Sequence, residues 1–303
     1  MTLWLGLSCP ECGEARDLSA DDRAKLRAKH PVQCSHGHRF RREDGFLHWL
    51  LETSPFGSSL ISCDTVFQGE IDPTELNRTP VLTRSLPRSL EAAEIWWRTP
   101  PEWPAVQARA LYLDVSNGVV RAILPLRIPD RREGVTGHIQ FQVVGAANPE
   151  KLPGWRQVLA EAVAAYEEGR HNVAALLGNV ALETFYSSIA DPILMAKGMP
   201  ESIVQLLHSR IPLEDRLARG FADPLALPSL SGAPFWADWK RRARRPRNSL
   251  AHRWMFDRDA KKAQASKEDA RLLLFLHLKA LCHLNPQCFD WLLELEAKKV
   301  TPR

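Results

Sequence analysis

One stretch of the sequence, residues 240 to 253, gathers side chains that could hold a phosphate group and act on it. It reads KRRARRPRNSLAHR and carries seven lysine or arginine residues and no acidic residue. Bringing so many like charges together is unfavourable unless an anion binds them, so the stretch predicts contact with a nucleic acid. The cations expected to hold the phosphate backbone, without reading its base sequence, are Lys240, Arg241, Arg242, Arg244, Arg245 and Arg253.

Arg247, Asn248 and His252, within the same stretch, are the candidates for catalysis. An imidazole whose pKa lies near neutrality can take or give a proton. A guanidinium can hold a phosphate and offset the charge that grows in a transition state. On an ideal helix Asn248 and His252 share a face and Arg247 lies off it. Either Pro246 breaks the helix and redirects Arg247, or the arginine acts across a dimer interface.

Three other residues near this stretch or preceding it have two interpretations each. Trp239 and Trp254 flank the basic residues and could stack on bases, but core packing is the expected role of both. Glu183 lies among apolar residues and could approach the site, but a structural salt bridge with an arginine is the favoured interpretation.

A second group of residues, near the N-terminus, has the spacing of a zinc site. Cys9 and Cys12 are two residues apart in a CPECG sequence, and Cys34 and His38 follow in CSHGH. Three thiolates and one imidazole complete the tetrahedral shell that Zn²⁺ prefers, which leaves no open position and predicts a structural ion. His36 is the competing fourth ligand, and its closer spacing to Cys34 makes it the less favoured one.

Composition places the chain among ordinary globular proteins. It has 303 residues, 45% of them hydrophobic, and a formal net charge of +4, so any strong positive field must come from local clustering. No apolar run approaches a membrane span and the N-terminus does not resemble a signal peptide, so we expect a cytoplasmic protein. In such a protein, single cysteines in apolar surroundings are expected in the core; they are Cys63, Cys282 and Cys288.

The patterning predicts a multidomain α+β protein with three segments. Residues 1–52 form the predicted zinc ribbon, ending in an Asp44-Gly45 turn. Residues 53–150 form a predicted antiparallel β domain, and residues 151–303 form a predicted helical bundle. The role of the β domain, as a sensor or specificity module, is inferred only by elimination.

Alternation of apolar residues identifies the strands of the middle segment. Residues 111–115 and 120–128 alternate on either side of Asn117-Gly118, which predicts a β-hairpin. Residues 138–143 predict another strand, and residues 60–67 a weaker one. Prolines between residues 80 and 104 argue against a long helix there, so Trp96, Trp97 and Trp103 are expected in a connection. These tryptophans could form a binding surface, but closing one end of the sheet is the favoured interpretation.

After residue 154 the apolar period becomes that of a helix. The second helix is expected to bury Val173, Leu176, Leu177, Val180, Phe185 and Ile189, and to stop at Asp191-Pro192. A loop is expected from residue 223 to residue 234. The predicted helices are 155–168, 171–190, 200–218, 235–254 and 267–282.

The order of these helices, with Arg247-Asn248-x3-His252 directly before the last apolar helix, resembles the HEPN superfamily. The resemblance covers about residues 152 to 295 and rests on the arginine, the polar residue after it, and the histidine. It implies a helical effector domain that pairs as a homodimer, so that two motifs make one composite site.

The resemblance also implies an activity, which is metal-independent cleavage of RNA. The 2′-hydroxyl of the RNA is the nucleophile, and the products are a 2′,3′-cyclic phosphate and a 5′-hydroxyl. Many stand-alone proteins with such effectors are toxins or antiphage abortive-infection factors, so a phage-derived or protein trigger is an expected partner. The alternative is a non-catalytic module that binds nucleic acid or a protein through the ribbon and the basic bundle.

Overall fold

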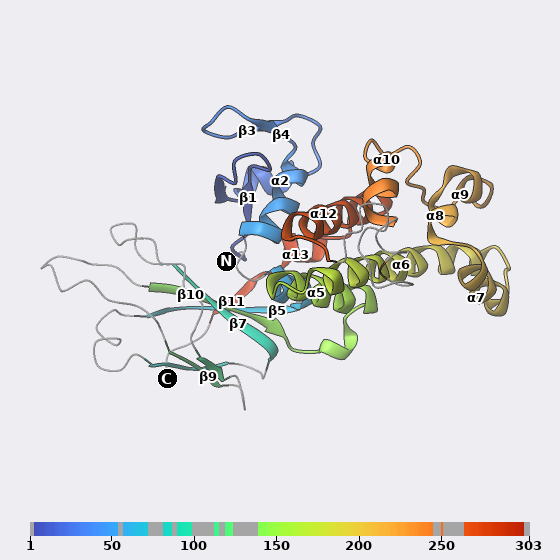
Figure 1. The fold of residues 1–303 in the computed structure, drawn as a ribbon. Coiled ribbons are helices and arrows are strands. Elements are labelled where there is room, and N and C mark those ends of the chain that lie inside the picture. Colours follow the sequence, from blue (N-terminus) through green and yellow to red (C-terminus); the bar gives the residue numbers. More distant parts are fainter. Residues whose placement is uncertain are drawn as a thin grey trace, which may run out of the picture. The chain divides into compact units, whose positions relative to one another are not determined.

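The protein is described by a computed structural model, in which helices and small β-sheets are mixed, as the predicted α+β class requires at that coarse level (Figure 1). The structure describes residues 3–53, 57–71, 81–86, 90–98, 112–114, 119–123, 139–244, 250 and 264–299. Contacts group the chain into two compact units, each made of separate segments. The first is Met1–Leu5, Ser59–Leu152 and Trp291–Arg303, and the second is Gly6–Ser58 and Pro153–Asp290. Residues 6–58, which we call the cysteine-rich segment, are thus grouped with the C-terminal helices.

A four-stranded sheet forms the centre of the first unit. Its strand order is β11-β5-β10-β7, with β10 antiparallel to both β5 and β7, and β11 parallel to β5. The strands are β5 (Thr65–Ile71), β7 (Glu91–Arg98), β10 (Ile139–Ala146) and β11 (Ala297–Lys299). The strand predicted from residue 138 is confirmed by β10, whereas residues 57–62 form a helix, α3 (Gly57–Ser62), and only the end of the predicted 60–67 strand is extended.

Strand β7 corrects the expectation that Trp96 and Trp97 lie in a connection. Both belong to this strand, and their backbones pair with Gln142 and Phe141 of β10. The sequence EAAEIWWR has the isoleucine and aromatic residues that favour strands, and the prolines lie before and after it. The prolines therefore mark the two ends of strand β7 and do not exclude a strand between them. Trp103 lies outside the described residues.

A three-stranded sheet accounts for the predicted hairpin. Its order is β6-β9-β8, and it consists of β6 (Val81–Ser85), β8 (Tyr112–Asp114) and β9 (Val119–Ile123). Strands β8 and β9 are antiparallel, with Tyr112 opposite Ile123, which confirms the predicted pairing. The Asn117-Gly118 turn itself lies outside the described residues.

Two buried glutamines hold the centre of the four-stranded sheet. The side-chain amide of Gln142 donates to Gln68 Oε1 at 3.0 Å, and Gln142 Oε1 accepts from the backbone N–H of Trp4 at 3.0 Å. Because a buried amide is costly unless it is paired, these bonds fix the segment at residues 3–5 to the sheet of its own unit.

The second unit begins with two short hairpins and a helix. The elements are β1 (Gly6–Ser8), β2 (Ala15–Asp17), α1 (Ala20–Ala24), β3 (Val32–Gln33), β4 (Arg39–Phe40), α2 (Arg42–His48) and the π-helical turn η1 (Trp49–Thr53). The predicted Asp44-Gly45 turn is wrong, because both residues lie inside α2. A Cβ on Gly45 would lie 2.5 Å from the Phe40 ring and 3.2 Å from Ser8 O, so this glycine permits close packing.

The rest of the second unit is helical. The helices are α5 (Gly154–Glu167), α6 (His171–Ala196), α7 (Glu201–Arg210), α8 (Leu213–Leu217), α9 (Arg219–Leu225), α10 (Trp236–Trp239), the π-helical turn η4 (Lys240–Arg244) and α12 (Lys267–Leu284). Two further elements, η3 (Pro149–Lys151) before α5 and α13 (Asp290–Glu294) after α12, belong to the first unit, except for Asp290. Helices α5 and α12 confirm their predictions, and Gly169, at φ +78°, ends the α5 segment as expected.

Three predicted helix boundaries are wrong. Helix α6 continues through Pro192 to Ala196 and ends before Gly198, at φ +84°, since burial of Leu194 offsets the single hydrogen bond that proline cannot make. The 200–218 segment is divided into α7 and α8 at Pro212. The predicted loop starts only after α9, at residue 226.

Helix α6 lies against both α5 and α12 and is the centre of the bundle (Figure 1). Its buried face combines larger residues with a run of small ones, which are Ala174, Ala175, Gly178 and Ala181. The predicted stripe is therefore wrong in part, because Val173 and Val180 are 37% and 43% exposed. Small side chains allow close approach, and a Cβ on Gly178 would lie 3.1 Å from the Leu274 side chain.

The same helix is the one described element long and apolar enough, by length and composition alone, to cross a membrane. Half of its most apolar stretch is buried inside the structure. Burial of this kind is what the core helix of a bundle shows.

The cysteine-rich segment is fastened to α12 and the turn after it. Lys279 Nζ lies 3.0 Å from Asp44 Oδ1, and Arg27 Nε donates to Pro286 O at 2.6 Å. The rings of Phe46 and Phe289 meet edge to face, with centroids 6.2 Å apart. These contacts combine an ion pair, a backbone bond and apolar burial, so the segment and the bundle form one packed unit.

Asp22 is a buried carboxylate that joins three parts of the cysteine-rich segment. It accepts from Arg16 of β2 at 2.5 and 3.0 Å, from Arg42 of α2 at 3.0 Å and from Ser19 Oγ at 2.8 Å. The Arg16 guanidinium, against the effect of burial, holds the pKa of Asp22 well below its usual range.

We predict that Asp22→Asn lowers the free energy of unfolding by about 2 kcal/mol at pH 7, the size expected for bonds to a charged group. Because the folded pKa is depressed, the contribution is complete above about pH 5 and is lost as the pH falls below the unfolded value of about 3.9. Denaturant unfolding at several pH values should show that the difference in unfolding free energy between wild type and Asp22→Asn disappears in acid. Asp21→Asn, on an exposed neighbour paired with Lys25, should show no such difference.

Candidate metal centre and basic segment

Two similar turns position the predicted zinc ligands. Cys9 follows β1, and the N–H of Gly13 donates to Cys9 O at 2.8 Å; Cys34 follows β3, and the N–H of Gly37 donates to Cys34 O at 3.0 Å. Both glycines have positive φ, +73° and +87°, which other residues adopt only with strain. Each turn therefore folds back tightly and leaves its cysteine sulfur at the tip of a hairpin.

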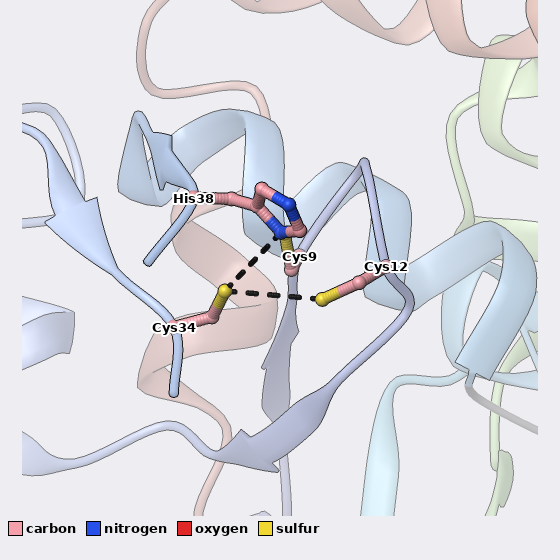
Figure 2. Close-up of side chains that lie close together, drawn as sticks. All are labelled: Cys9, Cys12, Cys34 and His38. Atoms are coloured by element: carbon pink, nitrogen blue, oxygen red, sulfur yellow. Dashed lines mark hydrogen bonds between the residues drawn. The ribbon is translucent and has the colours of Figure 1, made fainter. Parts of the chain in front are cut away.

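The two turns bring Cys9, Cys12, Cys34 and His38 together (Figure 2). Cys12 Sγ and Cys34 Sγ are 3.8 Å apart, and His38 Nδ1 lies 3.5 Å from Cys34 Sγ and 3.7 Å from Cys9 Sγ. Around zinc, with Zn–S of about 2.3 Å and Zn–N of about 2.0–2.1 Å, tetrahedral edges are about 3.8 Å between sulfurs and about 3.6 Å between sulfur and nitrogen. The four predicted ligands thus form a group that can hold one metal ion.

Local hydrogen bonds prepare these ligands for a cation. Burial opposes ionisation of Cys9, but hydrogen bonds from the backbone N–H groups of Cys12 and Glu11, together with those from the Cys12 and Cys34 thiols, outweigh it and lower the pKa of the Cys9 thiol to about 7. Glu11 Oε2 lies 3.7 Å from His38 Nε2, on the ring nitrogen that does not face the sulfurs. A carboxylate at that nitrogen orients a ligating imidazole.

A second group overlaps the first. Cys12, Glu14, Cys34 and His36 also have ligand atoms within 4.8 Å of one another. His36 Nδ1 is 3.6 Å from Cys12 Sγ and 3.4 Å from Glu14 Oε2. The sequence suggested His36 only as a substitute for His38, and Glu14 was missed, although a carboxylate two residues after a candidate ligand was a usable signal.

The described part of the basic stretch follows a buried tryptophan and carries exposed arginines. Trp239 is 1% exposed, which confirms its expected core role, and its ring stacks on Trp236 at 5.2 Å and 7°. Lys240 Nζ lies 5.4 Å from the centre of the Trp236 ring. Arg241 and Arg242 keep 62% and 50% of their side chains exposed.

Asp238 is the carboxylate next to these arginines, 2.5 Å from Arg241 and 3.8 Å from Arg242. One negative charge stands against two exposed guanidinium groups and the neighbouring Lys240. The described face therefore keeps a net positive charge that a phosphate could meet.

The three catalytic candidates, Arg247, Asn248 and His252, lie outside the described residues. So do Pro246, Trp254 and two of the predicted phosphate-holding residues, Arg245 and Arg253, whereas Arg244 is described only as the last backbone position of η4. The mutual arrangement of the candidate catalytic groups stays a prediction.

Glu183 takes part in a polar network that joins α6, α7 and α8. It pairs with Arg216, whose side chain is 2% exposed, in agreement with the favoured salt-bridge interpretation. Arg216 Nη1 also donates to His208 Nδ1 at 2.5 Å, and His208 Nε2 donates to Asp191 Oδ1 at 2.5 Å. Both ring nitrogens of His208 are hydrogen-bonded, so the network links α6, α7 and α8.

The chain was compared with known protein families, curated proteins and solved structures, and none of the three comparisons found a match.

We predict that Cys34→Ser removes bound metal, because Cys34 belongs to both ligand groups. Metal content measured by mass spectrometry should fall from at least one zinc per chain to near zero. Circular dichroism should show that the hairpins lose order, since metal binding supplies much of the folding energy of so small a segment. Cys63→Ser, at a buried cysteine outside both groups, is the matched control and should retain the metal. A well-folded Cys34→Ser protein with full zinc content would contradict the assignment.

Proposed function

We propose that the protein is a metal-independent endoribonuclease of the HEPN type. The observation that carries the proposal is the sequence Arg247-Asn248-x3-His252 within the basic stretch, which begins with η4 and precedes the apolar helix α12. In this mechanism His252 takes the proton from the 2′-hydroxyl as its oxygen attacks phosphorus, and the proton is given to the 5′-oxygen as the bond from that oxygen to phosphorus breaks. Arg247 holds the phosphate, and Asn248 helps to orient it.

The described helices support this proposal by fixing where the basic stretch begins. The turn η4 contacts both α6 and α12, and the buried Trp239 anchors the residues just before it. The side chains of Arg241 and Arg242, on this turn, are largely exposed to solvent. RNA held by such residues would be bound through its backbone, independently of base sequence.

The metal centre has a supporting role in the proposal. Cys9, Cys12, Cys34 and His38 would hold a zinc ion in a closed shell, and that ion would supply folding energy to the hairpins. Through Asp44 and Phe46, the ordered segment packs against α12 and the following turn of the same unit. In this proposal zinc stabilises the segment that packs against the bundle, and the cleavage reaction involves only the catalytic side chains and the RNA 2′-hydroxyl.

The proposed biological role is that of a toxin or an antiphage abortive-infection effector. In this proposal two copies pair through the helical bundle, as HEPN domains do, so that two motifs form one site. The first two predicted segments, residues 1–52 and 53–150, recognise a phage-derived or protein trigger or restrain the nuclease.

We predict that purified protein cuts total RNA into fragments with 2′,3′-cyclic phosphate and 5′-hydroxyl ends, and that His252→Ala lowers the rate at least 100-fold while RNA binding is retained. End chemistry is read by selective ligation or phosphatase treatment, and binding by filter retention. The assay is run with and without EDTA, with zinc content measured in the same samples, so that loss of the structural ion is not mistaken for a metal-dependent reaction.

His30→Ala is the matched control, because His30 is an exposed histidine of the same unit outside every proposed site. If wild type and His252→Ala leave RNA equally intact, even when phage-infected cell extract is added as a source of trigger, the nuclease proposal is wrong. Retained binding with no cleavage would then favour the non-catalytic module.

We also predict that Arg241→Ala and Arg242→Ala each weaken RNA binding uniformly across sequences. Each loses one phosphate contact, so the slope of log K against log salt should become shallower by about 0.7 for single-stranded RNA. Arg219→Ala removes an exposed arginine outside the stretch, which is likewise paired with an aspartate, and should leave the slope unchanged.

A further inference from the structure

We propose that the metal centre binds two divalent ions, with Cys12 and Cys34 as thiolates shared between them. The inner ion takes Cys9 and His38 as its other ligands, and the outer ion takes Glu14 and His36. This proposal rests on the zinc site proposed above and adds a second position to it.

The geometry of the shared edge motivates the proposal. Cys12 Sγ and Cys34 Sγ are 3.8 Å apart, the length of one edge of a zinc–sulfur tetrahedron. Two tetrahedra can share such an edge, because a thiolate sulfur has enough lone pairs to bind two metal ions. Each ion then needs two more ligands, and the protein presents two separate pairs.

The outer pair has ligand-like spacing of its own. His36 Nδ1 lies 3.6 Å from Cys12 Sγ, close to the sulfur–nitrogen edge of about 3.6 Å expected around zinc. Glu14 Oε2 is 3.4 Å from His36 Nδ1, near the distance between two ligands of one ion. The backbone N–H of Ser35 donates to the same Glu14 oxygen at 2.8 Å, which holds the carboxylate beside the second turn.

Charge balance favours the second ion. One zinc with three thiolates and a neutral imidazole carries a net negative charge, with the Glu14 carboxylate adding another beside it. A second dication with Glu14 and neutral His36 makes the whole cluster neutral. Soft thiolates and an imidazole select zinc over magnesium or calcium.

Exposure separates the two positions. Among the ligands that the two ions do not share, Cys9 of the inner position is fully buried, whereas the side chain of His36 of the outer position is 64% exposed. Ligands that stay in water must lose more freedom to bind, so the outer ion should be held less tightly and exchange faster than the inner one.

The test is the metal stoichiometry of the full-length chain. Reduced protein is equilibrated with excess zinc, desalted and analysed by mass spectrometry; in parallel, metal-stripped protein is titrated with Co²⁺ and followed by thiolate-to-cobalt absorption. We expect two ions per chain, the second with at least tenfold weaker affinity. Glu14→Gln combined with His36→Ala should bind one ion and keep the strong first phase.

The matched control is Asp21→Asn combined with His30→Ala, an exposed carboxylate and histidine of the same segment outside both ligand groups. It should keep two ions. One ion in wild type, or two ions that persist in Glu14→Gln with His36→Ala, would overturn the two-ion centre while leaving the inner zinc site standing. No bound ion in wild type would overturn both proposals.

Discussion

Close packing around α6 is the constraint on which the second unit depends. The buried face of this helix is lined by alanines and Gly178, so α5 and α12 can approach its backbone closely. Leu182 and Phe185 of the same helix are buried as well, whereas Val180 stays partly exposed. A single added methyl at Gly178 would press on Leu274, because protein interiors have little free volume. The cysteine-rich segment on α12 and the basic turn η4 are both positioned by this arrangement.

Several features were predictable because they depend on residues close together in sequence. The alternation on either side of Asn117-Gly118 is enough to pair β8 with β9, since the side-chain period of a strand is two. The spacing of Cys9, Cys12, Cys34 and His38 anticipated their convergence, because each pair needs only a tight turn. Helix α12 begins at Ser266 with a side-chain cap, and its apolar period is uninterrupted.

Other features depend on contacts between distant parts of the chain and could not be predicted from local patterns. Helix α6 passes through Pro192, because packing of its last turn outweighs one lost hydrogen bond. Gly45 does not form a turn; the absence of a side chain there allows the Phe40 ring to pack against the backbone. Strand β11 forms because it can pair with the edge of β5. The approach of Glu14 to His36 requires both hairpins at once. The candidate catalytic trio rests on sequence alone.

The division of the chain has a consequence for its synthesis. The backbone passes between the two compact units four times, after residues 5, 58, 152 and 290. Strand β5 has β10 on one side and receives β11, residues 297–299, on the other. Because chains emerge from the ribosome N-terminus first, that edge of the sheet stays open until residues 297–299 have emerged. A polypeptide that stalls shortly before residue 297 therefore exposes unpaired backbone groups that can recruit a strand from another chain.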